Sequence, residues 1–287
     1  MVFKFSQPVS VKSLYFDPPL EIKSVEGGDE VTVVFSRKLE EGRKVTADII
    51  VEDSKMNTLN VIVPFRTRND RMPVLIFNEL RTEYSKPKVE FVEFVSQGKG
   101  NLGAMRLFVA GHSLSTPAYE FPPVEVEAGE YIVLHLRTLE EDCLDETGKD
   151  ISCSGGTEAQ STARDFWLPG TKKLLHKTDA LWLVDQDDRI IDAILLSEKP
   201  DAKWSSDKAA EAAALFGGKK AWVPLRDDSK NGPPVPSDAV ITAGTTNTRT
   251  ICRDENLPPK PCAGSWYITA ASSATPGRAN NPKRFTP

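Results

Sequence analysis

The chain has 287 residues, 39% of them hydrophobic, so it can bury a sizeable core and is long enough for two domains. A formal net charge of −5 argues against a protein that binds nucleic acid, because that binding depends on clustered lysine and arginine. No stretch approaches the roughly 20 apolar residues of a membrane span. The sequence therefore predicts neither a nucleic-acid partner nor a membrane-spanning segment.

The first 70 residues contain short β-forming runs with turn residues between them. Residues 31–35, 47–51 and 59–65 are rich in valine and isoleucine, which favour strands. Short strands at this spacing are typical of a small sandwich. We therefore expect a first domain over residues 1–70.

Two turn motifs follow each other within this first segment. Leu39 and Gly42 lie in the first turn, and Asp53 and Asn57 lie in the second. The order of the turns resembles that of bacterial immunoglobulin-like modules, and the resemblance implies an immunoglobulin-like sandwich. The alternative is that the segment is an N-terminal β-extension of the second domain.

Six phrases in order occupy the rest of the chain. In the second phrase, the acids Glu90 and Glu93 interrupt valine and phenylalanine, which predicts a strand with its aromatic side chains buried. The phrases are residues 76–80 (IFNEL), 89–94 (VEFVEF), 101–107 (NLGAMRL), 126–134 (VEAGEYIVL), 179–194 (DALWLVDQDDRIIDAI) and 274–280 (ATPGRAN). Their order resembles that of the lamin tail domain family.

The resemblance to the lamin tail domain family implies a second immunoglobulin-like β-sandwich, used for binding or scaffolding rather than for chemistry. We therefore expect an all-β protein with two immunoglobulin-like β-sandwiches in tandem, over residues 1–70 and 71–287. The second sandwich would be lamin-tail-like and would carry a short helical insert.

The helical insert is expected at residues 201–222. Ser206 can cap the run KAAEAAALF, which is rich in good helix formers, and the glycine pair that follows can end the helix. The apolar side of this helix would contain Ala210, Ala214 and Leu215, and would pack across one end of the sandwich.

Four cysteines form two equally spaced pairs in polar, loop-like stretches: Cys143 with Cys153, and Cys252 with Cys262. Zinc would require shorter spacing or neighbouring histidines, so two local disulfides are expected, with free thiols or a metal site as the alternatives. Disulfides imply an exported protein, and we expect that Met1 replaces a removed signal peptide.

Two groups of acidic side chains could support chemistry. Glu79, Glu90 and Glu93 fall on strands that could be neighbours, but a structural role at a strand end is favoured for Asn78 and Glu79. Residues 185–188 (DQDD) could bind calcium, but a hairpin turn is favoured because the glycine and glutamate of an EF-hand are missing. In the absence of nucleophile, nucleotide or zinc motifs, we expect no catalytic residues, no metal ligands and no cofactor.

Aromatic side chains could provide a face for a sugar or a peptide. Most of the tryptophans have aliphatic neighbours and are expected in the core. Trp167 and Trp204 have polar neighbours, so they are the candidates for an exposed ligand platform.

The last of the six phrases contains a turn signal. Proline fixes φ and glycine allows a positive φ, so Thr275-Pro276-Gly277 predicts a tight turn. This turn should bring the C-terminal segment back beside the strand at residues 74–80.

Together these features predict a non-catalytic, exported bacterial protein of the periplasm or cell surface that binds a protein or glycan partner or acts as a scaffold. A monomer is expected, and a lipid anchor is possible. The alternative is a secreted hydrolase of nuclease or phosphoesterase type, or an accessory domain of one, since lamin-tail-like modules accompany such enzymes.

Overall fold

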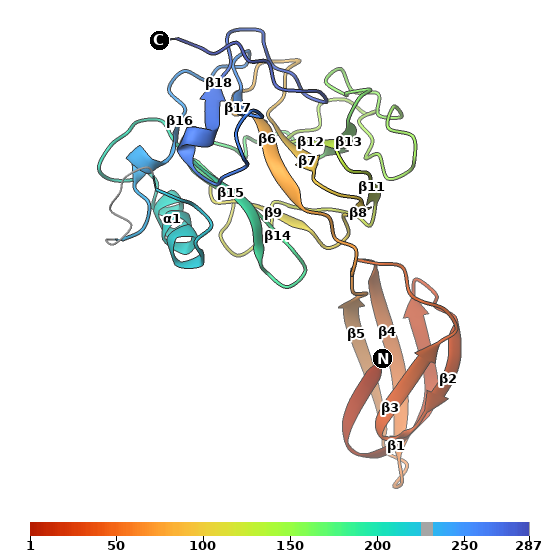
Figure 1. The fold of residues 1–287 in the computed structure, drawn as a ribbon. Coiled ribbons are helices and arrows are strands. Elements are labelled where there is room, and N and C mark those ends of the chain that lie inside the picture. Colours follow the sequence, from red (N-terminus) through yellow and green to blue (C-terminus); the bar gives the residue numbers. More distant parts are fainter. Residues whose placement is uncertain (225–231, 287) are drawn as a thin grey trace. The chain divides into compact units, whose positions relative to one another are not determined.

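The computed structural model describes residues 1–224 and 232–286. Strands dominate, with one α-helix among the described residues, so the predicted all-β class is confirmed (Figure 1). The chain divides into two compact units, Met1–Asp70 and Arg71–Pro287. No helix in the described part of the chain is long and apolar enough to cross a membrane.

The first unit is one five-stranded antiparallel sheet in the order β2-β3-β1-β4-β5. Its strands are β1 (Val2–Asp17), β2 (Ile22–Glu26), β3 (Gly28–Phe35), β4 (Lys44–Asp53) and β5 (Thr58–Arg66). The long strand β1 pairs with β3 at its start and with β4 from Val9 onward, with a register shift between Lys4 and Val9. This change of partner lets a single sheet curl.

The curled sheet encloses a core of its own. Alternate residues of β4 are buried, as expected for a strand with one face in a core. Phe16 of β1 meets Phe35 of β3 and Phe65 of β5 edge-on, with ring centroids 5.4 and 6.3 Å apart. One continuous sheet supplies this core, so the expected tandem of two immunoglobulin-like sandwiches is not confirmed. The residues of this core all belong to the first unit. The alternative, in which the first 70 residues are a β-extension of the second domain, is therefore not supported either.

The second unit contains two main sheets that share one hydrophobic core. The larger sheet has the order β13-β12-β7-β6-β17-β18, the smaller has the order β10-β9-β14-β15-β16, and β8 pairs with β11. The strands are β6 (Leu75–Arg81), β7 (Phe91–Ser96), β8 (Gly100–Asn101), β9 (Arg106–Val109), β10 (Tyr119–Glu120), β11 (Glu125–Val126), β12 (Tyr131–His135), β13 (Arg164–Trp167), β14 (Asp179–Val184), β15 (Ile190–Ser197), β16 (Val240–Ile241), β17 (Ile251–Arg253) and β18 (Trp266–Ile268).

A buried ion pair joins the two sheets. Arg253 of β17 donates from Nη2 to Oδ2 of Asp192 on β15 at 2.5 Å, and the same oxygen accepts the backbone N–H of Phe77 at 2.9 Å. Burial raises the pKa of Asp192, and the Arg253 charge opposes that rise. Each of the two side chains would be a buried charge without a partner if the other were absent. The pair therefore favours the alignment of the two sheets that brings Arg253 and Asp192 together.

A β-bulge at Asn78 decides which side chains of β6 face away from the core. β6 and β7 pair Phe77 with Phe94 and Glu79 with Glu93, so Asn78 has no opposite residue. The two phenylalanines lie in the core between the sheets. Side chains alternate along β7, so Glu93, next to Phe94, projects from the other face, which we call the outer face. The extra residue at the bulge turns Glu79, the partner of Glu93, to that same face. The predicted burial of the aromatics is confirmed, but both acids are buried as well.

Helix α1 (Asp207–Lys219) lies within the stretch expected to hold an insert. Ser206 caps it, since its hydroxyl accepts the backbone N–H of Ala209 at 3.3 Å. The predicted stop at the glycine pair is wrong, because the helix ends with Lys220 in the left-handed conformation at φ 56°. A Cβ on Gly217 would lie 3.2 Å from Pro234, so glycine here permits close packing rather than ending the helix.

The buried side of α1 also differs from the expected one. Its buried residues are Ala209, Ala212, Ala213 and Phe216, whereas Leu215 is 37% exposed. The helix therefore packs through a face rotated from the one assigned by sequence.

Candidate functional site

The closing segment, residues 272–281, forms the turn that the sequence predicts. The N–H of Arg278 donates to the carbonyl of Thr275 at 3.2 Å, and Gly277 has φ +79°. A Cβ at Gly277 would lie 2.7 Å from the Thr162 hydroxyl, so the tight approach also requires glycine.

Two buried carboxylates anchor this turn to the outer face of the six-stranded sheet. Glu79 of β6 accepts the N–H of Thr275 at 3.0 Å, and Glu93 of β7 accepts the N–H of Gly277 at 2.5 Å. Thr250 donates its hydroxyl to Glu79 as well. The predicted return of the closing segment to the strand at residues 74–80 is therefore confirmed, and the structural role favoured for Glu79 agrees with these contacts.

Burial shifts the pKa values of these two glutamates. It raises the pKa of Glu79, and it raises the pKa of Glu93 well above the usual value, with the Glu79 charge adding to the rise. The neighbouring thiol of Cys252 also has its pKa raised well above normal, mainly by burial. Burial therefore disfavours the charged form of each of these groups.

A second segment, residues 138–163, covers another part of the outer face, and we call it the covering loop. Asp165 of β13 contacts Nε2 of His135 at 2.8 Å and accepts the N–H of Gln160 at 2.5 Å. Glu146 in the loop accepts the N–H of Asp165 at 2.8 Å. Buried polar contacts therefore hold both the covering loop and the closing segment in place.

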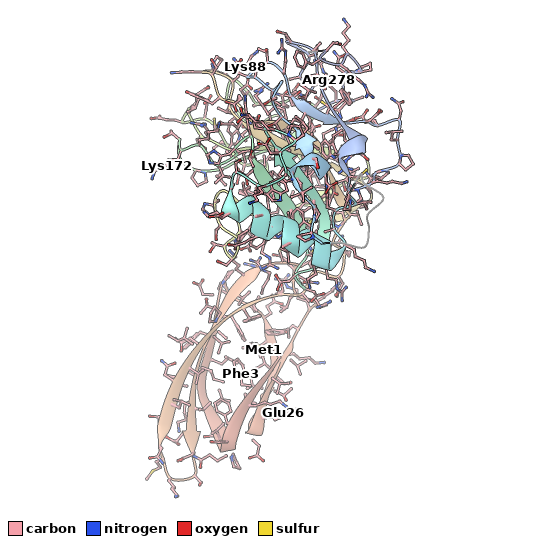
Figure 2. All side chains as sticks on the ribbon, turned by 90° about the vertical axis from the view of Figure 1, so that its left-hand side faces the viewer. Met1, Phe3, Glu26, Lys88, Lys172 and Arg278 are labelled. Atoms are coloured by element: carbon pink, nitrogen blue, oxygen red, sulfur yellow. The ribbon has the colours of Figure 1, made fainter. Side chains whose placement is uncertain are left out.

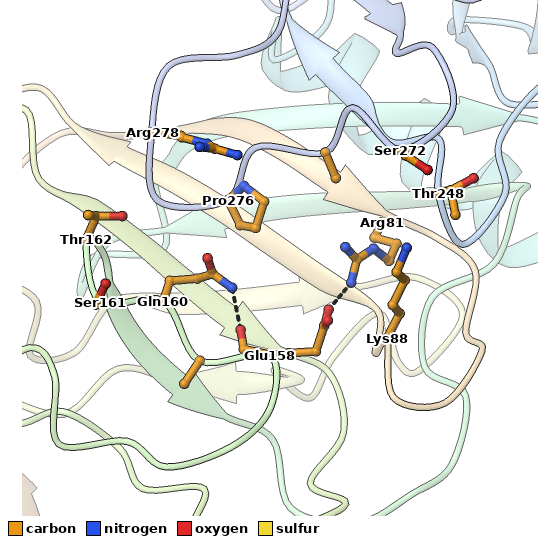
Figure 3. Close-up of a pocket in the computed structure, with 12 residues that line it drawn as sticks. Arg81, Lys88, Glu158, Gln160, Ser161, Thr162, Thr248, Ser272, Pro276 and Arg278 are labelled. Carbon is orange, nitrogen blue, oxygen red and sulfur yellow. Dashed lines mark hydrogen bonds and ion pairs between the residues drawn. The ribbon is translucent and has the colours of Figure 1, made fainter.

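A pocket of about 540 Å³ lies between these two coverings (Figure 3). Its lining is polar and includes several hydroxyl groups. The lining residues are Arg81, Lys88, Glu158, Ala159, Gln160, Ser161, Thr162, Thr248, Ser272, Ala274, Pro276 and Arg278. Strand β6 contributes Arg81 at its end, and loops contribute the others.

The pocket carries more positive than negative charge, although the whole chain is acidic. Arg81, Lys88 and Arg278 are its cationic side chains, and Glu158 is its one carboxylate. Glu158 is already ion-paired with Arg81. An anionic group is therefore the complementary ligand.

Arg81 is held rigidly, and some of its N–H donors make no hydrogen bond to the described residues. The residue is 4% exposed, and its guanidinium carbon lies 4.9 Å from the centroid of the Phe91 ring. Nη1 donates to the carbonyl of Val89 and to Glu158. Nε is buried without a hydrogen-bond partner. A fixed guanidinium with unused donors suits the recognition of a carboxylate or phosphate.

The two predicted ligand platforms are not exposed. Trp167 is 6% exposed, stacks on His135 with ring centroids 3.8 Å apart, and donates from Nε1 to Ser154 at 2.8 Å. Trp204 is half-buried against the core and donates to the carbonyl of Pro234 at 3.1 Å. Both indoles therefore hold loops in place, and the prediction of an exposed platform is wrong.

The acidic groups weighed for chemistry are engaged in structure. Glu90 forms a buried ion pair with Arg137. In the hairpin at residues 185–188, Asp185 accepts the N–H groups of Asp187 and Arg189 at 2.8 and 2.9 Å, as a turn requires.

The four cysteines are free thiols, so the two predicted disulfides are absent. Strand β17 directs Cys252 toward Thr250, with Sγ 3.8 Å from its hydroxyl, whereas Cys262 lies 3.4 Å from the Ser265 hydroxyl. The equal spacing of the two cysteine pairs in the sequence did not show that Cys252 and Cys262 contact different residues rather than each other. The expectation of export rested on the disulfides and loses that support.

Thiol labelling of the native protein should modify exposed Cys153 first and leave buried Cys252 protected until unfolding. Burial blocks access to Cys252 and disfavours its thiolate. Mass mapping after timed alkylation measures the order, with full labelling in denaturant as the control. A Cys252–Cys262 cross-linked peptide from oxidant-free preparations would contradict the structure.

The fold and the pocket define an all-β protein whose most distinctive site is a cationic pocket on the outer face of a sheet. Residues 73–268 match the family model described as "protein second domain", which spans more than half of the chain. The chain therefore belongs to this second-domain family.

Two further similarities were found. An "Uncharacterized protein" of Treponema pallidum (strain Nichols) is 26% identical over 211 residues, which are 68% of this chain and 53% of that protein. The chain thus spans about half the length of this relative. A crystal structure of a DUF4876 family protein from Bacteroides thetaiotaomicron aligns with 95% of this chain and 89% of that one, at 11% identity and a TM-score of 0.31, too low to support a shared topology.

The resemblance to the lamin tail domain family is therefore wrong. The family model that matches residues 73–268 is that of the second-domain family and not of a lamin tail domain. The six phrases describe strands and turns that unrelated all-β proteins also use, so their order did not identify a family.

Proposed function

We propose that this protein is a non-catalytic binding module that holds a polar group of a protein or glycan partner in the pocket on its outer face. The observation that carries the proposal is the pocket itself, because it is polar, cationic and bounded by two segments that buried contacts hold in place. Such preorganisation lowers the cost of ordering a binding surface.

The same contacts argue against the hydrolase alternative. Glu79 and Glu93 are the carboxylates on neighbouring strands, but both are fully buried and accept hydrogen bonds from the closing segment. Carboxylates in these positions cannot reach a substrate bond. We therefore expect no hydrolysis of glycosides, phosphoesters or nucleic acids with added Mg²⁺, Ca²⁺ or Zn²⁺.

A pocket-blocking variant tests the proposal. Ser161 lines the pocket, is exposed and can be replaced by tryptophan without removing a core contact. Labelled wild-type protein should bind members of a glycan array or peptide library, and Ser161→Trp should lose that binding. Ser205→Trp, at an exposed serine outside the pocket lining, is the matched control. Binding that is unaffected by Ser161→Trp, or product formation by the wild-type protein, would overturn the proposal.

A further inference from the structure

We propose that the pocket recognises the carboxylate of an acidic saccharide, and that Nη2 of the Arg81 guanidinium is its principal donor. This inference rests on the binding function proposed above and names the chemical class of the ligand.

The assignment of Nη2 follows from how Arg81 is used. Both of its hydrogen bonds to protein groups leave from Nη1, to Val89 and to Glu158. Nε is buried, so a ligand in the pocket does not reach it. Nη2 makes no hydrogen bond to the described residues and is not among the buried atoms without a partner, so its two N–H groups are open to an anion.

The position of Arg81 favours an anion at Nη2. The guanidinium is held in place by its contacts to Val89, Glu158 and Phe91, so its charge is preorganised for a ligand oxygen. Lys88 and Arg278 also line the pocket, and no carboxylate among the described residues pairs with either of them. Figure 2 shows both of them at one end of the second unit. They would attract an anion toward Arg81.

The remainder of the lining favours a saccharide over a peptide. Ser161, Thr162, Thr248 and Ser272 offer hydroxyls, and Gln160 offers an amide, which can exchange hydrogen bonds with sugar hydroxyls. The apolar contribution comes from two alanines and one proline. The apolar anchor side chains of a peptide would find no matching pocket in this lining, whereas sugar hydroxyls would find these polar partners. A volume of about 540 Å³ suits a ligand of a few sugar units.

Calorimetry with matched oligosaccharides tests the inference. An oligouronate should bind, and its carboxyl-reduced, neutral counterpart should bind about 10-fold or more weakly, the loss expected for a charge-assisted hydrogen bond. Affinity for the oligouronate should fall with added salt. A phosphorylated neutral oligosaccharide and an acidic peptide complete the ligand set.

Three variants locate the contact. Arg81→Lys keeps the charge but removes the fixed Nη2 donor, so it should weaken oligouronate binding about 10-fold or more. Lys88→Gln and Arg278→Gln change side chains at the pocket rim, so they should fold and each weaken binding about 3-fold or more. Lys172→Gln is the matched control, because Lys172 is an exposed cation outside the lining (Figure 2). If Arg81→Lys fails to fold, the double variant of Lys88 and Arg278 carries the test.

The outcomes distinguish failure of this ligand assignment from failure of the proposed binding function. Equal binding of charged and neutral oligosaccharides, tighter binding of the phosphorylated sugar or the acidic peptide, or insensitivity to the cationic variants would overturn the inference while leaving a binding module. If no glycan or peptide binds the wild-type protein, the proposed function itself fails.

Discussion

Removal of residues 273–287 is expected to lower the stability of the second unit by several kcal/mol, or about 10 °C in melting temperature for a domain of this size. The deletion removes the groups that Glu79 and Glu93 hydrogen-bond, at Thr275 and Gly277. Leaving a buried acceptor without its donor costs roughly 1–3 kcal/mol for each acceptor. It also removes the pairing of Phe285 with Ile268, which protects the edge strand β18. We therefore expect a shortened chain that also aggregates.

Scanning calorimetry of two shortened chains decides this prediction. Deletion of residues 1–70 is the control, because the second unit has its own core and should melt at an unchanged temperature. An unchanged transition after the C-terminal deletion, or failure of residues 71–287 to fold, would show that the two units are not stabilised as the contacts indicate.

The elements that sequence predicted well were those with a local physical signal. The strand at residues 89–94 follows from its alternation of apolar and acidic residues, and the closing turn follows from Pro276 and Gly277. The C-terminal end of α1 could not be predicted as well from the sequence. Packing of Gly217 against Pro234 overrides the usual preference of glycine for a helix end.

The pocket had no such signal. Arg81, Lys88, Glu158 and Arg278 are scattered over most of the second unit, and none belongs to a short motif. They meet because two long segments cross the outer face of one sheet. The clue in the sequence that came nearest to the pocket was the set of acids that includes Glu79 and Glu93, which were expected on neighbouring strands and do face each other there. Sequence could not show that they hold the segment that lines the pocket.

The aromatic and cysteine predictions failed for a related reason. Composition indicated polar surroundings for Trp167 and loop surroundings for Cys252, but polar residues can be buried when they are hydrogen-bonded. Trp167 lies beneath the covering loop, and Cys252 lies beside the anchored glutamates. The direction of a side chain depends on strand register, which spacing alone does not determine.

Stability should fall as the pH rises from about 4.5, the ordinary glutamate value, through the raised folded-state values of Glu79 and Glu93. Each group has a higher pKa in the folded state than in the unfolded state, so the folded state binds more protons within this range. Unfolding then becomes easier as protons are removed. Asp192 has its pKa raised by burial as well and acts in the same direction.

Glu93→Gln should remove the contribution of one group. Within its titration range, the stability of the variant relative to wild type should rise by up to about 1.4 kcal/mol per pH unit. The amide can still accept the N–H of Gly277, so the closing segment keeps an anchor. A constant offset between the two proteins reflects the change of contacts to Asn78, and only the dependence on pH reports the ionisation.

Urea unfolding of wild type and Glu93→Gln at a series of pH values measures this difference. Glu211→Gln, at an exposed position on α1, is the matched control and should give a difference that does not change with pH. The groups facing Glu93 are Glu79, Glu255, Asn78 and the closing segment, so its raised pKa depends on that segment staying in place. A pH-independent difference for Glu93→Gln would mean that water reaches the carboxylate and that the closing segment does not seal this face.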